Sequence, residues 1–168
     1  GEELRSIGEA APDVHWAEPR WSPSGDTIAA VRWAGDGLHD IVLIDSTGRM
    51  LREVTRDRAV EGTPTWAPDG RHLLFWSDRS GIPNLYAYDL QGDRLRQVSN
   101  VVSGAFQPDV SPDGQWIVFS LYRADGYHIA RMPYDPGSWR GAGEPAPDAL
   151  PIASSRIHPP VDGIRRDY

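Results

Sequence analysis

The stretch Thr63–Asp89 reads TPTWAPDGRHLLFWSDRSGIPNLYAYD, a Trp, a Pro-Asp-Gly turn, an apolar run, a polar loop and a second apolar run. Pro68 presets φ for a turn, Asp69 can bond the local backbone, and Gly70 suits a left-handed position. The run LLFW is typical of a strand buried on both faces, and the alternation in LYAY indicates another strand. The stretch therefore predicts short antiparallel strands joined by tight turns.

The same pattern occurs three times in the chain. PRWSPSGDTIAAVRW begins at Pro19, PTWAPDGRHLLFWSD at Pro64 and PDVSPDGQWIVFSLY at Pro108. The turn prolines and glycines recur at spacings of 45 and 44 residues, at Pro23, Pro68, Pro112, Gly25, Gly70 and Gly114. Four short strands in a unit with a period in the forties are typical of a β-propeller blade.

We therefore predict an all-β fold, a β-propeller of four-stranded antiparallel blades with about three blades in this chain. The expected blades cover 19–55 and 63–99, followed by an incomplete blade over 107–135. In the middle unit the four strands are expected at 63–67, 72–77, 84–89 and 94–99. Gly70 and Gly114 are expected to have positive φ, because the turn needs a left-handed residue there.

The repeat resembles the TolB-like, WD-repeat-like β-propeller family. The resemblance is carried by Trp66 to Gly70 (WAPDG), by Ser77-Asp78-Arg79 and by Gly81. It covers about residues 1–135; the first unit departs from it with Ser24 in place of Asp. The resemblance implies a six-bladed ring and an exported, periplasmic protein. It implies no single function, since the family includes binding scaffolds and propellers attached to serine peptidases.

The start of the chain resembles the last strand of a blade. Gly1–Ile7 shares the pattern G-x-x-L-R-x-[IV] with Gly48–Val54 and Gly92–Val98. We expect residues 1–8 to be the outer strand of a preceding blade, whereas the third unit lacks such a strand. Three blades alone would expose the apolar outer face of blade one, with Trp21 and Trp33, and that of blade three. Two copies could complete one another as a homodimer closing a six-bladed ring. Alternatively, the chain, which begins without Met, is a fragment of a longer propeller.

Composition changes near the end of the chain and limits the possible functions. Residues 136–168 are rich in Pro, Gly, Ala and Ser, which predicts an extended tail or linker. The net charge of −7 argues against a nucleic-acid-binding surface, which needs a basic face. The absence of Cys excludes disulfides and thiolate metal sites. No apolar run approaches the length of a membrane span.

Catalytic and metal-binding motifs are missing from the sequence. There is no G-x-S-x-G elbow, no phosphate-binding glycine loop, and the five His residues stand singly. The acidic glycine loops 34–40 and 123–128 leave calcium open as an alternative to ordinary turns, although neither has EF-hand spacing. We therefore expect no enzyme activity, no cofactor and no metal.

Binding residues are expected at one mouth of the propeller channel. The loops that precede each first strand cluster there, and first strands line the channel. Aromatic side chains beside charged ones suit recognition of a peptide or a small polar ligand. The candidates are His15, Trp16, Glu18, Arg20, Arg56, Arg58, Glu61, Phe106, Gln107 and Asp109.

The leading hypothesis is a non-catalytic propeller scaffold that binds a protein or peptide partner through this mouth. The alternative is the accessory propeller of a larger enzyme, such as a prolyl-oligopeptidase-like serine peptidase, with its catalytic domain absent here. The sequence by itself does not identify the partner, since a fold hosts many functions.

Overall fold

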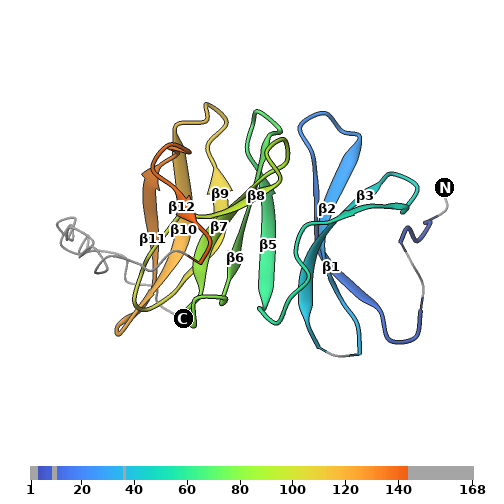
Figure 1. Cartoon of the computed structure of the whole chain (residues 1–168), viewed down its shortest axis with the longest axis horizontal. Coiled ribbons are helices and arrows are strands. Elements are labelled where there is room, and N and C mark those ends of the chain that lie inside the picture. The colour runs from blue at the N-terminus through green and yellow to red at the C-terminus, as the bar shows by residue number, and fades with distance from the viewer. Residues whose placement is uncertain (1–3, 9–10, 36, 144–168) are drawn as a thin grey trace, which may run out of the picture.

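Three antiparallel β-sheets stand side by side in the molecule, each twisted against the next (Figure 1). The computed structural model describes residues 4–8, 11–35 and 37–143. Every regular element among these residues is a strand. The prediction of an all-β fold built from antiparallel propeller blades is therefore confirmed.

Blades one and two each contain the four expected strands. Blade one consists of β1 (His15–Trp21), β2 (Thr27–Trp33), β3 (His39–Asp45) and β4 (Met50–Glu53). Blade two consists of β5 (Glu61–Trp66), β6 (His72–Ser77), β7 (Asn84–Asp89) and β8 (Arg94–Gln97). Within each blade the strands pair in sequence order. The strands expected at 72–77 and 84–89 have the bounds that the sequence indicated.

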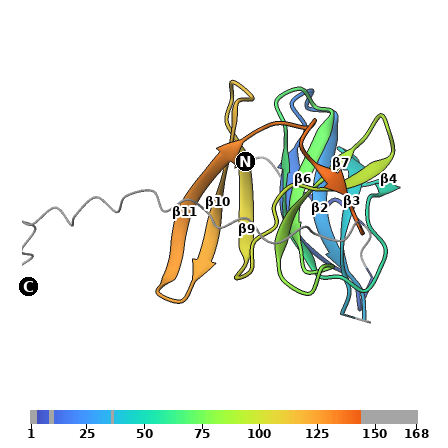
Figure 2. The same ribbon diagram turned by 60° about the vertical axis from the view of Figure 1, so that its left-hand side comes forward.

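Blade three differs from the other two because its sheet has three strands. It consists of β9 (Ala105–Val110), β10 (Trp116–Arg123) and β11 (Gly126–Pro133), with β11 at the outer edge. The following short strand, β12 (Arg140–Gly141), pairs with β8 of blade two instead of with β11. Figure 2 shows the chain crossing from blade three to blade two after β11.

The turn between the first two strands of each blade has the expected geometry. Gly70 and Gly114 both have a φ of 67°, and the corresponding Gly25 has a φ of 75°. The predicted left-handed glycines are therefore confirmed. In each turn the glycine N–H donates to the carbonyl three residues earlier, which closes a tight turn.

The first strand of each blade begins earlier than the sequence indicated. β1 begins at His15, four residues before the expected start of blade one at residue 19. β5 and β9 each begin two residues before the expected starts at 63 and 107. The pairing of each first strand shifts register at the residue before its proline, which forms a β-bulge. The strand continues on both sides of the bulge, so the proline does not mark its start.

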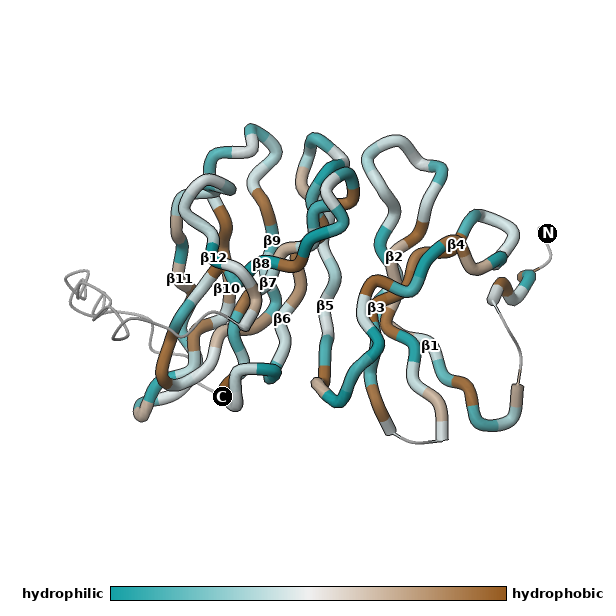
Figure 3. Tube along the Cα trace, in the orientation of Figure 1, coloured by the Kyte–Doolittle hydropathy of each residue, from teal (hydrophilic) through white to brown (hydrophobic). Residues whose placement is uncertain are grey.

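The hydrophobic core lies between the blades, and the hydrophobic residues concentrate in the strands (Figure 3). Leu73 and Phe75 face blade one, and Leu74 and Leu85 face blade three. All four are fully buried, and for Leu73, Leu74 and Phe75 the apolar run LLFW predicted this. Burial of each such side chain contributes about 1.5–3 kcal/mol to folding. Blade two is therefore packed on both faces.

The outer face of blade one is covered, contrary to the expectation that it is exposed. Ile28 and Ala30 alternate with the residues that face blade two, and both are buried. The N-terminal segment passes along this blade, and a Cβ at Gly48 would collide with the backbone nitrogen of Gly8. Only Trp21, which is 55% exposed, follows the expectation.

Two further expectations concern the two ends of the chain, which lie partly outside the described residues. Of the expected N-terminal outer strand, residues 1–3 lie outside the described residues, and residues 4–8 are not in a strand. Of the expected tail, residues 144–168 lie outside the described residues. Its described beginning packs on blade two: Trp139 is 4% exposed and contacts the ring of His72 edge-on.

Candidate functional site

The first strands β1, β5 and β9 lie next to one another and form the inner side of the array (Figure 1). In each of them the residue before the proline has a left-handed backbone, which non-glycine residues adopt rarely. These residues are Glu18, Thr63 and Gln107, with φ values of 52°, 49° and 52°. The bulge is thus a repeated feature of the inner strands, and it turns polar side chains of neighbouring blades toward one another.

Hydrogen bonds connect the inner strands across the blades. One oxygen of the Glu18 carboxylate accepts a hydrogen bond from the backbone N–H of Thr63. The other oxygen of this carboxylate accepts a hydrogen bond from the Thr63 hydroxyl at 3.4 Å. The Thr65 hydroxyl donates to Asp109 at 3.3 Å. The Gln107 side-chain oxygen accepts the hydroxyl of Ser120 at 2.9 Å within blade three. Glu18, Gln107 and Asp109 remain exposed.

An aromatic stack lies at the end of the molecule where the first strands begin, called here the loop end. The ring of Trp33 lies between His15 and His39, with centroid distances of 5.3 and 4.8 Å. Next to it, the guanidinium of Arg32 lies 6.0 Å from the centre of the Trp16 ring. Trp33 was expected on an exposed outer face, but it is half-buried, because it packs against the core between blades one and two and the two His rings stack on it.

A second aromatic cluster occupies the loop end of blades two and three. Phe106 contacts Trp76 and Tyr127 edge-on, at centroid distances of 5.4 and 6.2 Å. Tyr122 lies 5.1 Å from Tyr127. Tyr127 is 69% exposed, so the cluster presents aromatic surface to solvent. Such rings supply contact area that loses little conformational entropy on binding.

Charged side chains gather in a pocket of about 440 Å³ at the loop end of blade one. It is lined by Arg32, Ala34, Leu38, Asp40, Glu53, Arg56, Asp57 and Arg58. The lining carries three Arg and three acidic residues, so its charges balance. Arg58 and Arg56 are exposed there. The pocket suits a polar ligand that carries both signs of charge better than a simple anion.

Glu61 does not lie in a loop at the channel mouth, as was expected. It belongs to β5 and is fully buried. Its carboxylate accepts hydrogen bonds from Thr55 at 2.7 Å, from Ser77 at 3.0 Å and from the guanidinium of Arg79. Burial raises the pKa of Glu61 above its usual range. Since all of its partners are internal, Glu61 joins the blades and has no access to a ligand.

The structure brings most of the other sequence-predicted residues to the inner strands or the loop end. His15, Trp16, Phe106, Arg56 and Arg58 lie at the loop end. Glu18, Arg20, Gln107 and Asp109 lie on the inner strands. Trp33, His39, Trp76, Tyr122 and Tyr127 were not predicted. They end second strands or begin third strands, and only antiparallel pairing brings those positions beside the starts of the first strands.

Among residues 4–8, 11–35 and 37–143, no three His, Asp or Glu side chains come together as a set of metal ligands. The same part of the chain contains no helix that is long and apolar enough to cross a membrane.

Comparison with known proteins identifies the repeat. The model of the TolB beta propeller domain family matches residues 6–154. The chain belongs to this family. A Tol-Pal system protein TolB from Anaeromyxobacter dehalogenans strain 2CP-C is 35% identical over 125 residues, which are 74% of this chain and 28% of the relative. The chain therefore matches less than a third of the length of this curated TolB relative.

Solved structures show the same fold. TolB from Acinetobacter baumannii superposes with a TM-score of 0.62 at 24% identity, covering 74% of this chain and 31% of that one. An oligogalacturonate lyase in complex with manganese superposes with a TM-score of 0.58 at 20% identity, covering 76% of this chain and 36% of the lyase. TolB propellers and propeller enzymes thus share this architecture, and likeness at this identity shows the fold alone.

Proposed function

We propose that this TolB-family chain is a non-catalytic scaffold that binds a protein or peptide partner at the loop end and along the inner strands. The supporting observation is the gathering of exposed charged and aromatic side chains, from three blades, on this one side. Binding surfaces are enriched in Tyr, Trp, Phe and Arg, and the two aromatic clusters and the Arg-rich pocket have this composition.

The proposal also concerns catalytic activity and the cellular compartment of the protein. The chain acts without catalysis or a bound cofactor, since its exposed polar groups at the loop end suit recognition and no catalytic motif occurs in the sequence. We place it in an exported, periplasmic compartment because its curated relatives are named as Tol-Pal system proteins.

Site-specific photo-crosslinking tests the proposed binding surface. A photoreactive amino acid is placed at His15 or Gln107 and, as a control, at Arg49, an exposed turn residue at the opposite end of blade one. We expect a discrete protein adduct in cells of the source organism from the first two positions and none from Arg49. The same adduct from all three positions, or no adduct from His15 and Gln107, would contradict the proposal.

We also propose that further blades complete the ring, supplied by a second copy in a homodimer or by a longer parent chain. The outer face of blade three supports this, since Val118, Tyr122 and Ile129 are exposed on it. Light scattering of the purified chain tests it. A monodisperse particle of 18.6 kDa that unfolds cooperatively would show that no ring closure is needed.

A further inference from the structure

The outer strand of blade one is fixed by hydrogen bonds around a single residue of β3. The carbonyl of Ile41 accepts the N–H groups of Val54 at 2.8 Å and Thr55 at 3.3 Å. The N–H of Ile41 donates to the Thr55 hydroxyl at 2.8 Å. Val54 and the hydroxyl residue Thr55 together therefore provide hydrogen-bond partners for both the carbonyl and the N–H of Ile41 at this edge.

Blade two repeats this arrangement with different residues. The carbonyl of Leu85 in β7 accepts the N–H groups of Val98 at 2.8 Å and Ser99 at 3.2 Å. The N–H of Leu85 donates to the Ser99 hydroxyl at 2.8 Å. The two sequences that follow this edge, Leu51–Thr55 (LREVT) and Leu95–Ser99 (LRQVS), share the pattern Leu-Arg-x-Val-Ser/Thr.

In blade three the corresponding edge has no such strand among the described residues. Ile129 follows Leu85 by 44 residues and is 83% exposed, whereas Leu85 is fully buried. The N–H of Tyr134 donates to Gln115 of the chain before β10. Because bonded and non-bonded pairs alternate along an antiparallel ladder, Ile129 and Arg131 turn their backbone groups toward the free edge.

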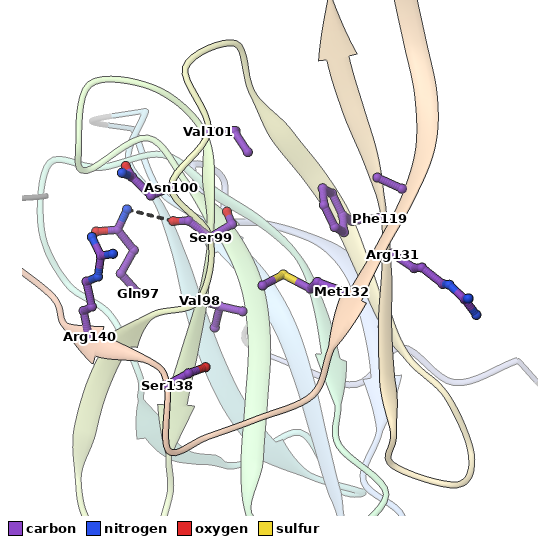
Figure 4. Close-up of a pocket in the computed structure, with 11 residues that line it drawn as sticks. Gln97, Val98, Ser99, Asn100, Val101, Phe119, Arg131, Met132, Ser138 and Arg140 are labelled. Atoms are coloured by element: carbon purple, nitrogen blue, oxygen red, sulfur yellow. Dashed lines mark hydrogen bonds between the residues drawn. The ribbon is translucent and has the colours of Figure 1, made fainter. Parts of the chain in front are cut away.

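A pocket lies beside this free edge, between blades three and two (Figure 4). Its volume is about 550 Å³. Phe119 and Met132 of blade three and Val98 and Val101 of blade two give it an apolar lining. In blade two, Leu95 lies opposite Tyr88. Met132 follows Tyr88 by 44 residues, so the leucine of an added strand would lie opposite Met132 and enter this pocket.

The charge at this edge differs from that in blade two. Arg96 lies opposite Ala87 in blade two, and Arg131 follows Ala87 by 44 residues. The Arg131 side chain extends away from the pocket, where its guanidinium lies 4.2 Å from the centre of the Trp116 ring (Figure 4). Like charges directly opposite one another destabilise a strand pair. An added strand should therefore carry an acidic residue opposite Arg131.

We propose that the free edge of β11 is a strand-addition site for an extended segment of a partner protein with the pattern Leu-Asp/Glu-x-Val-Ser/Thr. The segment pairs antiparallel to β11, and its Val and hydroxyl residues bond the carbonyl and N–H of Ile129. Its leucine fills the pocket beside Phe119 and Met132, and its carboxylate lies opposite Arg131. This site is separate from the proposed surface at the loop end.

Two stretches of this chain resemble the pattern but lack part of it. Leu4–Gly8 (LRSIG) has glycine in place of the hydroxyl residue and places Arg5 opposite Arg131. Leu150–Ser154 (LPIAS) has Pro151 at the position of Arg96, where proline has no N–H for the ladder. An external strand with the complete pattern therefore satisfies this edge better than either stretch or a second copy's N-terminus.

Fluorescence anisotropy with a labelled peptide tests the site on the full chain. The peptide has the Gly92–Asn100 sequence with the Arg96→Glu change, and the unchanged and scrambled sequences are controls. We expect saturable binding of the Glu peptide, about fivefold weaker binding of the Arg peptide, and no binding of the scrambled one. Equal binding of all three peptides, or binding of none, would overturn the proposal.

Two protein variants locate the binding on β11. Ile129→Pro removes an N–H that faces the free edge, so it should abolish peptide binding without disturbing the β10–β11 ladder. Arg131→Glu should reverse the preference, so that the Arg peptide binds more tightly. Arg123→Glu, a change of another exposed Arg of blade three, is the matched control and should leave the preference unchanged. An unreversed preference in Arg131→Glu would contradict the site even if Ile129→Pro fails to fold.

Other occupants of the edge give different results. Binding of the Glu peptide only after a Leu150→Asp change would show that the chain's own Leu150–Ser154 stretch fills the edge. A dimer in light scattering that becomes a monomer in Ile129→Pro would assign the edge to a second copy. Either result would overturn the proposal of a partner segment.

Discussion

Blades two and three have the same repeat but different surroundings. Leu85 in β7 and Ile129 in β11 occupy corresponding positions 44 residues apart, yet the first is fully buried and the second is 83% exposed. Blade two has a neighbour on each face and an outer strand on its edge, whereas blade three, within residues 4–8, 11–35 and 37–143, has one neighbour and a free edge. The difference shows that neighbours, more than the local pattern, decide which apolar residues form the core.

The largest expected effect separates these two positions directly. Leu85→Ala should reduce the free energy of unfolding by about 2–5 kcal/mol, because it leaves a cavity between blades two and three. Ile129→Ala should change it by less than about 0.5 kcal/mol, because the side chain is exposed. Urea denaturation of both variants provides the measurement. Equal losses would mean that the outer face of blade three is covered in solution.

The starts of the inner strands provide a second contrast. Glu61 begins the first strand of blade two, and Ala105 occupies the corresponding position in blade three. Both residues are buried, but the Ala105 side chain needs no polar partner. Glu61→Gln removes the charge that pairs with Arg79, and we expect a loss of about 1–3 kcal/mol in the free energy of unfolding. Chemical denaturation near neutral pH measures it. An unchanged midpoint and slope would show that the Glu61–Arg79 pair adds nothing to stability.

The turns should behave alike in the two blades, in contrast to the strands. Gly70 and Gly114 have the same φ, and a Cβ would meet no atom closer than 4.0 Å at either position. Replacement of either by Ala should cost about 1 kcal/mol through backbone strain alone. Thermal unfolding of the two variants should give matching shifts. A clear difference between them would indicate that the neighbouring blade also acts on the turn.

The smallest effect concerns His72, which joins blade two to the chain segment after β11. His72 Nδ1 lies 2.8 Å from the Tyr134 hydroxyl and 3.7 Å from the Asp69 carboxylate, and Arg71 and Asp89 lie nearby. Burial lowers the pKa of His72 below 6.5, although the two carboxylates oppose this.

The unfolded chain therefore binds more protons at His72 than the folded chain, so stability should decrease as pH falls below about 6.5. Thermal melts between pH 5 and 8 measure this decrease, and it should be smaller in His72→Gln. Identical pH profiles of the two proteins would show that His72 titrates normally in the folded state.

Much of the fold could be predicted from the sequence because its signals are local. Pro68-Asp69-Gly70 fixes a turn through φ preferences, and the run Leu73–Trp76 indicates a buried strand. The three bulges could not be predicted, because a proline after a polar residue is also compatible with a strand start. The destination of β12 was missed as well, since its pairing with β8 depends on a contact between distant segments.

The candidate site was predicted in part. His15, Phe106 and Gln107 were identified because they precede or begin the inner strands. Trp33 and Tyr127 were missed, since their positions at the loop end follow from the pairing of whole strands. Glu61 was assigned to the wrong environment, because its burial depends on Thr55, Ser77 and Arg79, which are 6 to 18 residues away.

The sequence alone determined the repeat, the turns and the strand type, because backbone preferences and side-chain alternation act over a few residues. The tertiary structure decided which faces are covered, which edge stays free and which charges are buried, because these depend on neighbours that the local pattern does not name. The pair Leu85 and Ile129 illustrates the division: the repeat places both at the same position of a third strand, and only the packing of blade three on blade two buries the first.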